Sequence, residues 1–423
     1  MNEFDFNPVE SIPTDWTVEN SLIKVIGVGG GGCNAVTYMY NQNIEGCHFI
    51  VCNTDSQALQ KSNVPTKIQL GEGLGAGTNP SKGRNAALES QDLIARTVLD
   101  NGTQMLFITA GMGGGTGTGA SPVIAKMAKD RGILTVGVVT IPFKNEGDDF
   151  LSKAVDGIHE LEKNVDSLLI INNEKLYDFF GNQLVHDAFP HADEVLATAV
   201  RGIIEIITQS GYVNVDFEDV KTMMRNSGMA LMGCGTGSGR NRLEDAVKGA
   251  LESPLLNDFD LKSCKNLLIN ITAGKNEQGL RMDELGKISD MINQYTGSVN
   301  KFKRGIIYDE NPEIGDTIRI TAIATGFKMN LIGIAGNDLG KLILIPNDFR
   351  YEDSLPTENG EVVLPEENIR INKLGINTSE NCRKFHFTSD KKPVLILEPG
   401  QSKAELEEVA AIRRTIRRPR TEE

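Results

Sequence analysis

The chain lacks long hydrophobic runs, and its first segment lacks positive charge. None of the apolar runs in the 423 residues approaches the length of roughly 18 residues that crosses a bilayer. Residues 1–20 contain no Lys or Arg and five acids, whereas a secretory signal starts with basic residues and continues with an apolar core. We therefore expect no membrane span, a cytoplasmic location, and a disordered acidic arm over residues 1–20.

Patterns typical of metal and nucleic-acid binding are also missing. The six cysteines include no Cys-x-x-Cys pair, and the five histidines show no ligand spacing. We therefore expect free buried thiols and no metal held by Cys or His. The net charge is −14, from 43 Lys and Arg against 57 Asp and Glu, and phosphate backbones bind clustered positive charge. Nucleic acid is therefore not an expected partner.

Glycine, in contrast, is abundant and clustered. The chain has 44 glycines in 423 residues, above the usual share of about 7%. Four short segments hold 19 of them: residues 27–32, 71–77, 111–119 and 233–239. We expect the first three to fall at strand ends, where glycine lets a ligand approach the backbone. For the fourth we expect only a tight connection.

Apolar runs alternate with helical patterns along most of the chain. Strands are predicted at residues 22–28, 48–52, 105–109, 134–139 and 167–171, with helices between most of them, the first at 34–43. Such runs predict an α/β fold with a parallel sheet covered on both faces. A long, largely buried helix is predicted at 193–209. A second unit follows with strands at 230–233, 266–271 and 317–324 and helices at 242–251 and 282–294.

Two glycine loops suggest phosphate binding. Residues 27–32 follow a strand and open a helix, whose unpaired N–H groups and dipole favour an anion. This loop also fits a dinucleotide fingerprint, because Asp55 follows it at about the sequence spacing of the acid that contacts ribose. A structural turn explains the loop as well. Residues 111–119 repeat the arrangement and add the hydroxyls of Thr116 and Thr118. A third loop, 71–80, could close over a terminal phosphate, and no G-x-x-x-x-G-K-[ST] motif occurs.

Residues 111–119 resemble the tubulin signature loop, and the chain from about 22 to 327 is similar to the tubulin/FtsZ GTPase family. Further matching segments lie at residues 29–34, 53–55, 73–80, 142–147, 214–220 and 322–327. The resemblance implies a Rossmann-type parallel-sheet GTPase domain, a long central helix and a second α/β domain. The expected division is 1–20, 21–192, 193–216, 217–327 and a C-terminal extension, 328–423.

The resemblance also implies a role for each matching residue. Glu146 would contact the ribose of GTP or GDP, and Asn173 and Asp193 would read the guanine edge. Phosphate would be held by Gly30, Gly31, Gly32, Cys33, Asn34, Gly115, Thr116 and Gly117. The chemistry agrees at the base, because a carboxylate accepts from N1–H and the amine of guanine and finds no such donors on the ring edge of adenine. Phe189 would either stack on the base or lie in the core.

The segment 212–220 carries the candidate catalytic residues. Asp216 and Asp219 are three residues apart and share a face of a helical turn. Spacing alone favours a cap for Asp216, before a helix at 217–226. The resemblance instead implies that Asn214, Asp216 and Asp219 act on the GTP of the next subunit, with Mg²⁺ bridging phosphate oxygens. Such a head-to-tail contact does not close and so makes filaments, here those of the bacterial division ring at mid-cell.

The sequence departs from the family at two places. Phe150 stands where the family has an arginine, after Asp148 and Asp149, which keeps a diverged scaffold with weak GTPase activity as an alternative. The C-terminal region lacks a recognisable partner peptide and ends in a helical pattern, 404–418, that is rich in Arg. Membrane-tethering and other division proteins are expected to bind there. A dinucleotide-dependent oxidoreductase, the remaining alternative, would leave the second glycine loop unexplained.

Overall fold

The computed structural model describes residues 21–327, apart from 101, 176, 178–184, 210–211, 214, 253–260 and 298, and five short strands between 341 and 396. For residues 144, 148, 185–192 and 312 only the backbone is described. The predicted acidic arm 1–20 and the predicted helix 404–418 lie outside the described residues. The chain forms two compact units, Met1–Ile334 and Ala335–Glu423.

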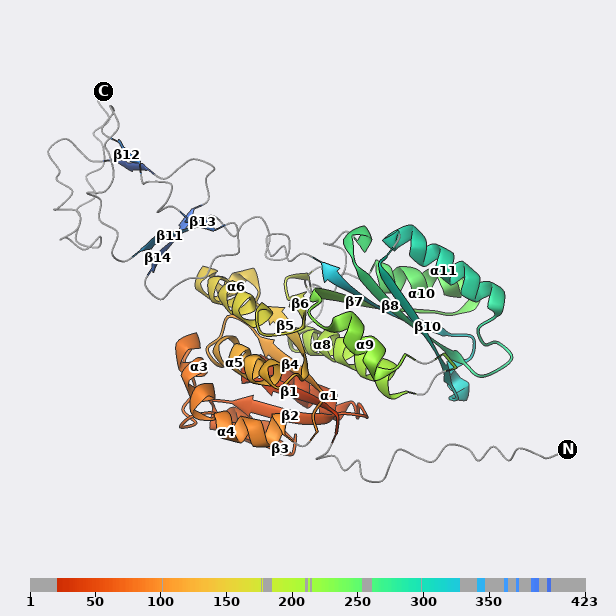
Figure 1. The fold of residues 1–423 in the computed structure, drawn as a ribbon, viewed down its shortest axis with the longest axis horizontal. Helices are drawn as coiled ribbons and strands as arrows, with labels where there is room; N and C mark the ends of the chain where they lie inside the picture. Colours follow the sequence, from red (N-terminus) through yellow and green to blue (C-terminus); the bar gives the residue numbers. More distant parts are fainter. Residues whose placement is uncertain are drawn as a thin grey trace. The chain divides into compact units, whose positions relative to one another are not determined.

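Six parallel strands form the first part of the sheet (Figure 1). Their order is β3-β2-β1-β4-β5-β6. The predicted strands are confirmed, with slightly different ends: β1 Ile23–Val28, β2 His48–Asn53, β4 Met105–Gly111, β5 Leu134–Ile141 and β6 Ser167–Asn172. The short β3, Thr66–Gln69, was not predicted, because only one of its four residues is buried and it shows no apolar run.

The same sheet continues into the second part of the unit. β7 Gly228–Gly237 lies parallel to β6, and β10 Ile318–Phe327 is antiparallel to β7 and to β8 Asn266–Gly274. β9 Lys301–Asp309 lies parallel to β8 at the edge. β9 was not predicted, because its first four residues include Lys301, Lys303 and Arg304 and interrupt any apolar pattern. One ten-stranded sheet therefore runs through both α/β regions that the sequence predicts, and both regions lie within the compact unit Met1–Ile334.

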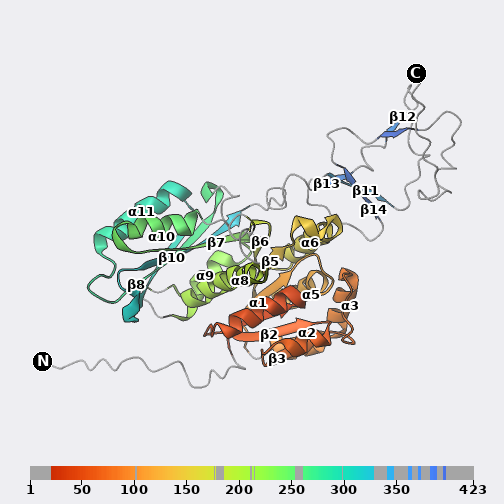
Figure 2. The ribbon, with the colours of Figure 1, turned by 180° about the vertical axis from the view of Figure 1, so that it is seen from behind.

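Helices cover both faces of this sheet. On one face α1 Gly29–Asn41, α8 Val185–Thr208 and α9 Phe217–Met224 share a single apolar core with the strands. α1 packs along α8, as Figure 2 shows from behind. The predicted burial of the central helix is confirmed in α8, where Leu196, Val200 and Ile203 are at most 3% exposed. The other face carries α5 Thr116–Asp130, α6 Asp148–Glu162 and α10 Arg242–Leu251, with α11 Met282–Thr296 against α10.

The fourth glycine cluster is not the tight connection that the sequence suggested. Its first three glycines belong to β7, and Gly235 and Gly237 let α10 pack directly on the strand. A Cβ at Gly235 would lie 2.0 Å from the carbonyl oxygen of Ala246, and one at Gly237 would lie 2.1 Å from that of Arg242. The glycines therefore serve helix–sheet contact in the second part of the unit.

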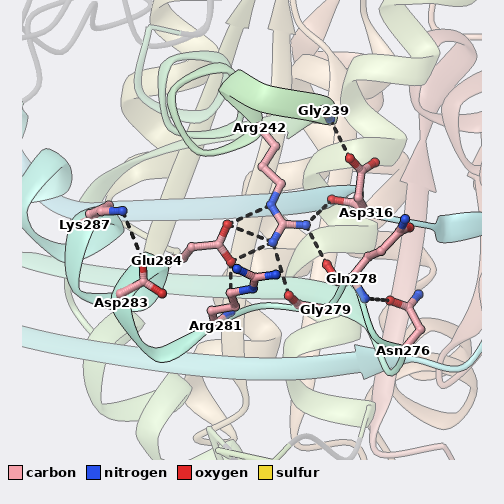
Figure 3. A network of polar contacts seen from close by, with 10 residues as sticks. All are labelled: Gly239, Arg242, Asn276, Gln278, Gly279, Arg281, Asp283, Glu284, Lys287 and Asp316. Atoms are coloured by element: carbon pink, nitrogen blue, oxygen red, sulfur yellow. Dashed lines mark hydrogen bonds and ion pairs between the residues drawn. The ribbon is translucent and has the colours of Figure 1, made fainter.

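A buried arginine joins the loops beside β8 (Figure 3). The guanidinium of Arg242 donates to both carboxylate oxygens of Glu284, at 2.8 and 2.6 Å. It also donates to the carbonyl oxygens of Gln278 and Asp316, each at 2.7 Å. Because the charge is paired and its donors are used, the network fixes the starts of α10 and α11 relative to each other.

The compact unit Ala335–Glu423 is described only as strands. β11 Lys341–Pro346 pairs with β13 Arg370–Asn372 and β14 Cys382–Phe387, and β12 Glu361–Val363 pairs with β15 Val394–Ile396. Two of these strands are apolar in sequence, β11 at residues 342–345 and β15 over its whole length. Within the part of the chain that the structure describes, the helices are all too short or too polar to cross a bilayer.

Candidate nucleotide-binding site

Two glycine loops meet where the strand order of the sheet reverses. β1 and β4 lie side by side, with Val28 opposite Ala110 at their carboxyl ends. β1 leads directly into α1, and β4 leads through residues 112–115 into α5. In open α/β sheets ligands bind outside the strand ends at this switch point. The sheet topology therefore indicates the same two loops as candidate ligand-binding loops as the sequence does.

The loops touch backbone to backbone, which explains their glycines. A Cβ at Gly29 would lie 2.7 Å from the amide nitrogen of Gly117, and one at Gly32 would lie 2.3 Å from the carbonyl oxygen of Thr109. The predicted start of the first helix at residue 34 is wrong. α1 begins at Gly29, because the loop is itself the first helical turn, entered through a φ of +75° at Gly29.

The opposite side of each loop is open. A Cβ at Gly30 or Gly114 would meet no atom within 4 Å. Both α1 and α5 begin without a side-chain cap. Their first N–H groups thus have no side-chain acceptor, and anions bind favourably at such helix starts. This arrangement fits a polyphosphate held between the two loops.

The third glycine loop, residues 71–79, lies against the second. A Cβ at Gly115 would lie 2.7 Å from the Cβ of Ala76. The third loop is also tied to the residues after β2, because the N–H of Gly75 donates to the carbonyl oxygen of Thr54 at 2.9 Å. Positive φ angles at Gly71, Gly73, Gly75 and Gly77 shape this loop. The loop is thus placed beside the candidate phosphate site, and its closure over a phosphate stays a prediction.

Several side chains of the loops turn inward. The thiol of Cys33 donates to the carbonyl oxygens of Gly27 and Cys52. Burial raises the pKa of this thiol to about 12. Only the backbone of Cys33 is therefore available to a ligand. Thr116 shares a 2.7 Å hydrogen bond with Thr54. The Thr118 hydroxyl accepts from the N–H of Gly113 at 2.9 Å and so shapes the loop.

Two further predicted residues lie at the surface of this region. Asn34 is exposed on the first turns of α1. Asp55 accepts from the N–H groups of Gln57 and Ala58 and caps α2 Ser56–Lys61. That capping role accounts for Asp55 without the ribose contact that the dinucleotide fingerprint suggested.

Two polar residues lie just after β6 and on α8, Asn173 and Asp193. The amide oxygen of Asn173 is buried and finds no hydrogen-bond partner within the described residues. Burial raises the pKa of Asp193 to about 6. Buried polar atoms are normally paired, and a desolvated acid marks candidate sites, so both fit a ligand that brings N–H donors, as guanine does.

Three more residues singled out in the sequence belong to this region. Glu146 is exposed, and its Oε1 accepts from the N–H of Phe143 at 2.9 Å, which orients the carboxylate. The side chain of Phe189 lies outside the described residues. Phe150 is half-buried on α6, and a Cβ at Gly113 would come within 3.0 Å of its ring. An apolar ring thus packs on the second glycine loop where the sequence comparison led us to expect a cation.

The segment 212–219 follows the far end of α8. Asp216 caps α9, its Oδ1 accepting from the N–H of Asp219 at 2.7 Å, which confirms the interpretation from spacing. Asn214 lies outside the described residues. Between Asp193 and the last residue of α8, Thr208, the helix rises about 22 Å at 1.5 Å per residue. The length of α8 therefore lies between Asp193 and the start of this segment.

One residue of this region had no signal in the sequence. The ammonium of Lys303, on β9, forms a 2.7 Å ion pair with the carboxylate of Asp219. The contact joins positions 84 residues apart in the chain, and β9 itself was not predicted. Only the tertiary structure brings this cation to the loop.

The fold and the two glycine loops at its switch point together define a nucleotide-binding α/β protein with a tubulin-like site. Residues 22–181 match the model for the Tubulin/FtsZ family, GTPase domain, and residues 228–328 match that for the FtsZ family, C-terminal domain. The chain belongs to the FtsZ family of tubulin-related GTPases.

Individual relatives agree. The chain is 42% identical to the cell division protein FtsZ of Wigglesworthia glossinidia brevipalpis, over 90% of this chain and 97% of that protein. It is 48% identical to that of Azotobacter vinelandii, over 76% and 80%. Among solved structures, an empty FtsZ dimer from M. jannaschii matches with a TM-score of 0.67 and 38% identity, over 74% of this chain and 91% of that one.

Proposed function

We propose that this protein binds and hydrolyses GTP and polymerises head to tail into filaments that form the ring at the bacterial division site. The observation that carries the proposal is the meeting of two uncapped glycine-rich helix starts at the switch point of the sheet. Membership in the FtsZ family supports GTP as the nucleotide.

The nucleotide would lie across the carboxyl ends of β1, β4 and β6. Backbone N–H groups of residues 30–34 and 115–117 would hold the phosphates, and Glu146 would contact the ribose. Asn173 and ionised Asp193 would accept from the guanine edge, which satisfies the buried amide oxygen. Mg²⁺ prefers phosphate oxygens and water, so the proposal assigns it no protein ligand; bound there, it would offset phosphate charge.

Hydrolysis would be completed by the next subunit. Because α8 separates the 212–219 segment from the base end, Asn214, Asp216 and Asp219 would face a neighbour's GTP. The carboxylates of Asp216 and Asp219 would orient a water for in-line attack on the γ-phosphorus and take up its proton, while the bond from the γ-phosphorus to the β-phosphate oxygen breaks. Little else is required of the protein, since phosphoryl transfer depends mainly on positioning and charge.

The test follows purified protein with GTP and Mg²⁺ by light scattering and by phosphate release. Polymer with release supports the proposal. Polymer without turnover instead supports the diverged scaffold, which the packing of Phe150 on Gly113 keeps as a second candidate. If polymer forms without turnover, the Phe150→Arg variant tests the cause. Recovery of GTP hydrolysis in this variant would show that phenylalanine at position 150 had abolished it. Absence of both polymer and GTP binding would contradict the proposal.

The five-segment division of the chain and the partners of residues 328–423 are also proposals. Tethering proteins would bind this C-terminal region. The test is capture of known division proteins by full-length chain against a chain ending at residue 334, where the first compact unit ends. Equal capture by both would contradict the assignment.

A further inference from the structure

The ammonium of Lys303 forms an ion pair with the carboxylate of Asp219, one of the proposed catalytic acids. The Lys303 ammonium lies 2.7 Å from Oδ1 of Asp219, with side-chain exposures of 50% and 25%. The hydrogen bond with Asp219, and the nearby charge of Asp216, raise the pKa of Lys303. The amine is therefore a cation at neutral pH, on a surface that solvent and a second subunit can both reach.

β9 and the 212–219 segment behave as one piece. The N–H of Tyr212 donates to the carbonyl oxygen of Ile306 at 2.8 Å, and the N–H of Ile306 donates to that of Val213 at 3.0 Å. A Cβ at Gly305 would lie 3.2 Å from Val215, so the strand and the segment are in close contact there. A side chain at 303 thus travels with the acids when this surface docks.

The charges explain why a cation is useful here. Asp216 and Asp219 would approach a triphosphate, and like charges in a partly desolvated contact repel. The neighbouring acid Glu218 already pairs with Lys221 at 2.8 Å. Lys303 offsets one of the two remaining negative charges and holds the Asp219 carboxylate in one orientation.

We propose that Lys303 is a positioning residue for GTP hydrolysis between subunits: it orients the Asp219 carboxylate and offsets its charge, so that the segment can enter the neighbour's nucleotide site. This inference rests on the proposed function. It concerns turnover within the polymer, and binding of GTP to the free subunit lies outside it.

The experiment compares Lys303→Met with Lys301→Met, using full-length protein, GTP and Mg²⁺. Lys301 is a matched control, because it is an exposed lysine two residues away on the same strand and the same face. Phosphate release per polymerised subunit and the critical concentration for polymer are measured separately. We expect Lys303→Met to reduce release per polymerised subunit about tenfold, Lys301→Met to stay within twofold of wild type, and GTP binding by free subunits to be unchanged.

Lys303→Arg keeps a cation that can pair with a carboxylate and should restore most of the turnover. A Lys303→Met polymer that hydrolyses GTP at the wild-type rate or faster overturns the inference, as does an equal loss in Lys301→Met. Failure of the proposed function looks different, since the wild-type polymer itself would then release no phosphate.

Discussion

At the scale of single residues, Asn173 and Asp193 are both in unfavourable environments. The buried amide oxygen of Asn173 lacks a partner within the described part of the chain, and burial disfavours the charge on Asp193. Each arrangement costs stability in the empty protein and is offset when a ligand donates hydrogen bonds. Guanine, with two adjacent donors on one edge, is a ligand of this kind.

Affinity for guanine nucleotides should depend on the proton of Asp193. Its pKa is raised to about 6, and only the ionised carboxylate accepts from both guanine donors. Affinity should therefore fall as pH drops through about 6, and Asp193→Asn should weaken GTP about tenfold to hundredfold and flatten this pH profile. Calorimetric titration from pH 5 to 8 measures both, with the exposed neighbour Glu194→Gln as control. An unchanged profile in Asp193→Asn would refute the assignment.

Asp216 should have two separable roles. Asp216→Ala removes the cap of α9 and should cost about 1 kcal/mol of unfolding free energy. It should keep GTP binding and lose hydrolysis. Asp216→Ser retains a capping oxygen without a carboxylate, so it should recover the stability but not the turnover. Urea unfolding and phosphate release decide, and a Ser variant that hydrolyses GTP normally would reduce Asp216 to a cap.

At the scale of elements, glycine sets how closely backbones pack. In the first part of the unit it joins α1 and α5 at their first turns, and a Cβ at Gly119 would lie 1.9 Å from the carbonyl oxygen of Pro80, where α3 Pro80–Glu89 crosses α5. In the second part it brings α10 onto β7. The same residue type therefore serves a ligand site in one place and core packing in the other.

Gly235→Ala should test the packing role. The added methyl would meet the α10 backbone, which cannot move aside cheaply, so we expect a loss of at least about 2 kcal/mol. Gly286→Ala is the matched control, because Gly286 lies within α11 with no atom within 4 Å of a Cβ, and it should gain about 0.5–1 kcal/mol. Midpoints of urea unfolding report both. A neutral Gly235→Ala would show that α10 shifts freely on the sheet.

At the scale of the molecule, one sheet and one long helix separate the nucleotide loops from the 212–219 segment. The nucleotide loops lie at the strand ends of the first part, and the 212–219 segment follows the other end of α8. A large side chain is exposed in that segment, with Tyr212 at 80%. Such exposure is typical of a surface that another molecule covers.

Tyr212→Ser should weaken polymerisation without unfolding the subunit. Losing a large apolar side chain from a contact costs about 1 kcal/mol or more, so the critical concentration should rise at least about fivefold. The melting temperature should hold, since the side chain is exposed. Leu93→Ser, an exposed leucine on α4 Gln91–Ile94, is the control and should change neither quantity. Sedimentation with GTP measures polymer, and an unchanged critical concentration would place Tyr212 outside the contact.

Much of the architecture was readable in the sequence, because local patterns carry it. Runs such as 134–139 are buried on both faces of a parallel sheet and needed no long-range information, and the helix 242–251 was predicted at its observed bounds. The misses have a common cause. β3 and β9 lie at the edges of the sheet, where burial is partial and apolar runs are short or broken.

By itself the sequence determined the glycine loops and the family to which the chain belongs, because these depend on residue types in short stretches. Only the tertiary structure decided which glycines pack and which face open space, since backbones from distant segments must meet before a Cβ can clash. It also brought Lys303 to Asp219 and placed the length of α8 between the acids and the base end, because such contacts and distances arise from sheet order and not from neighbouring residues.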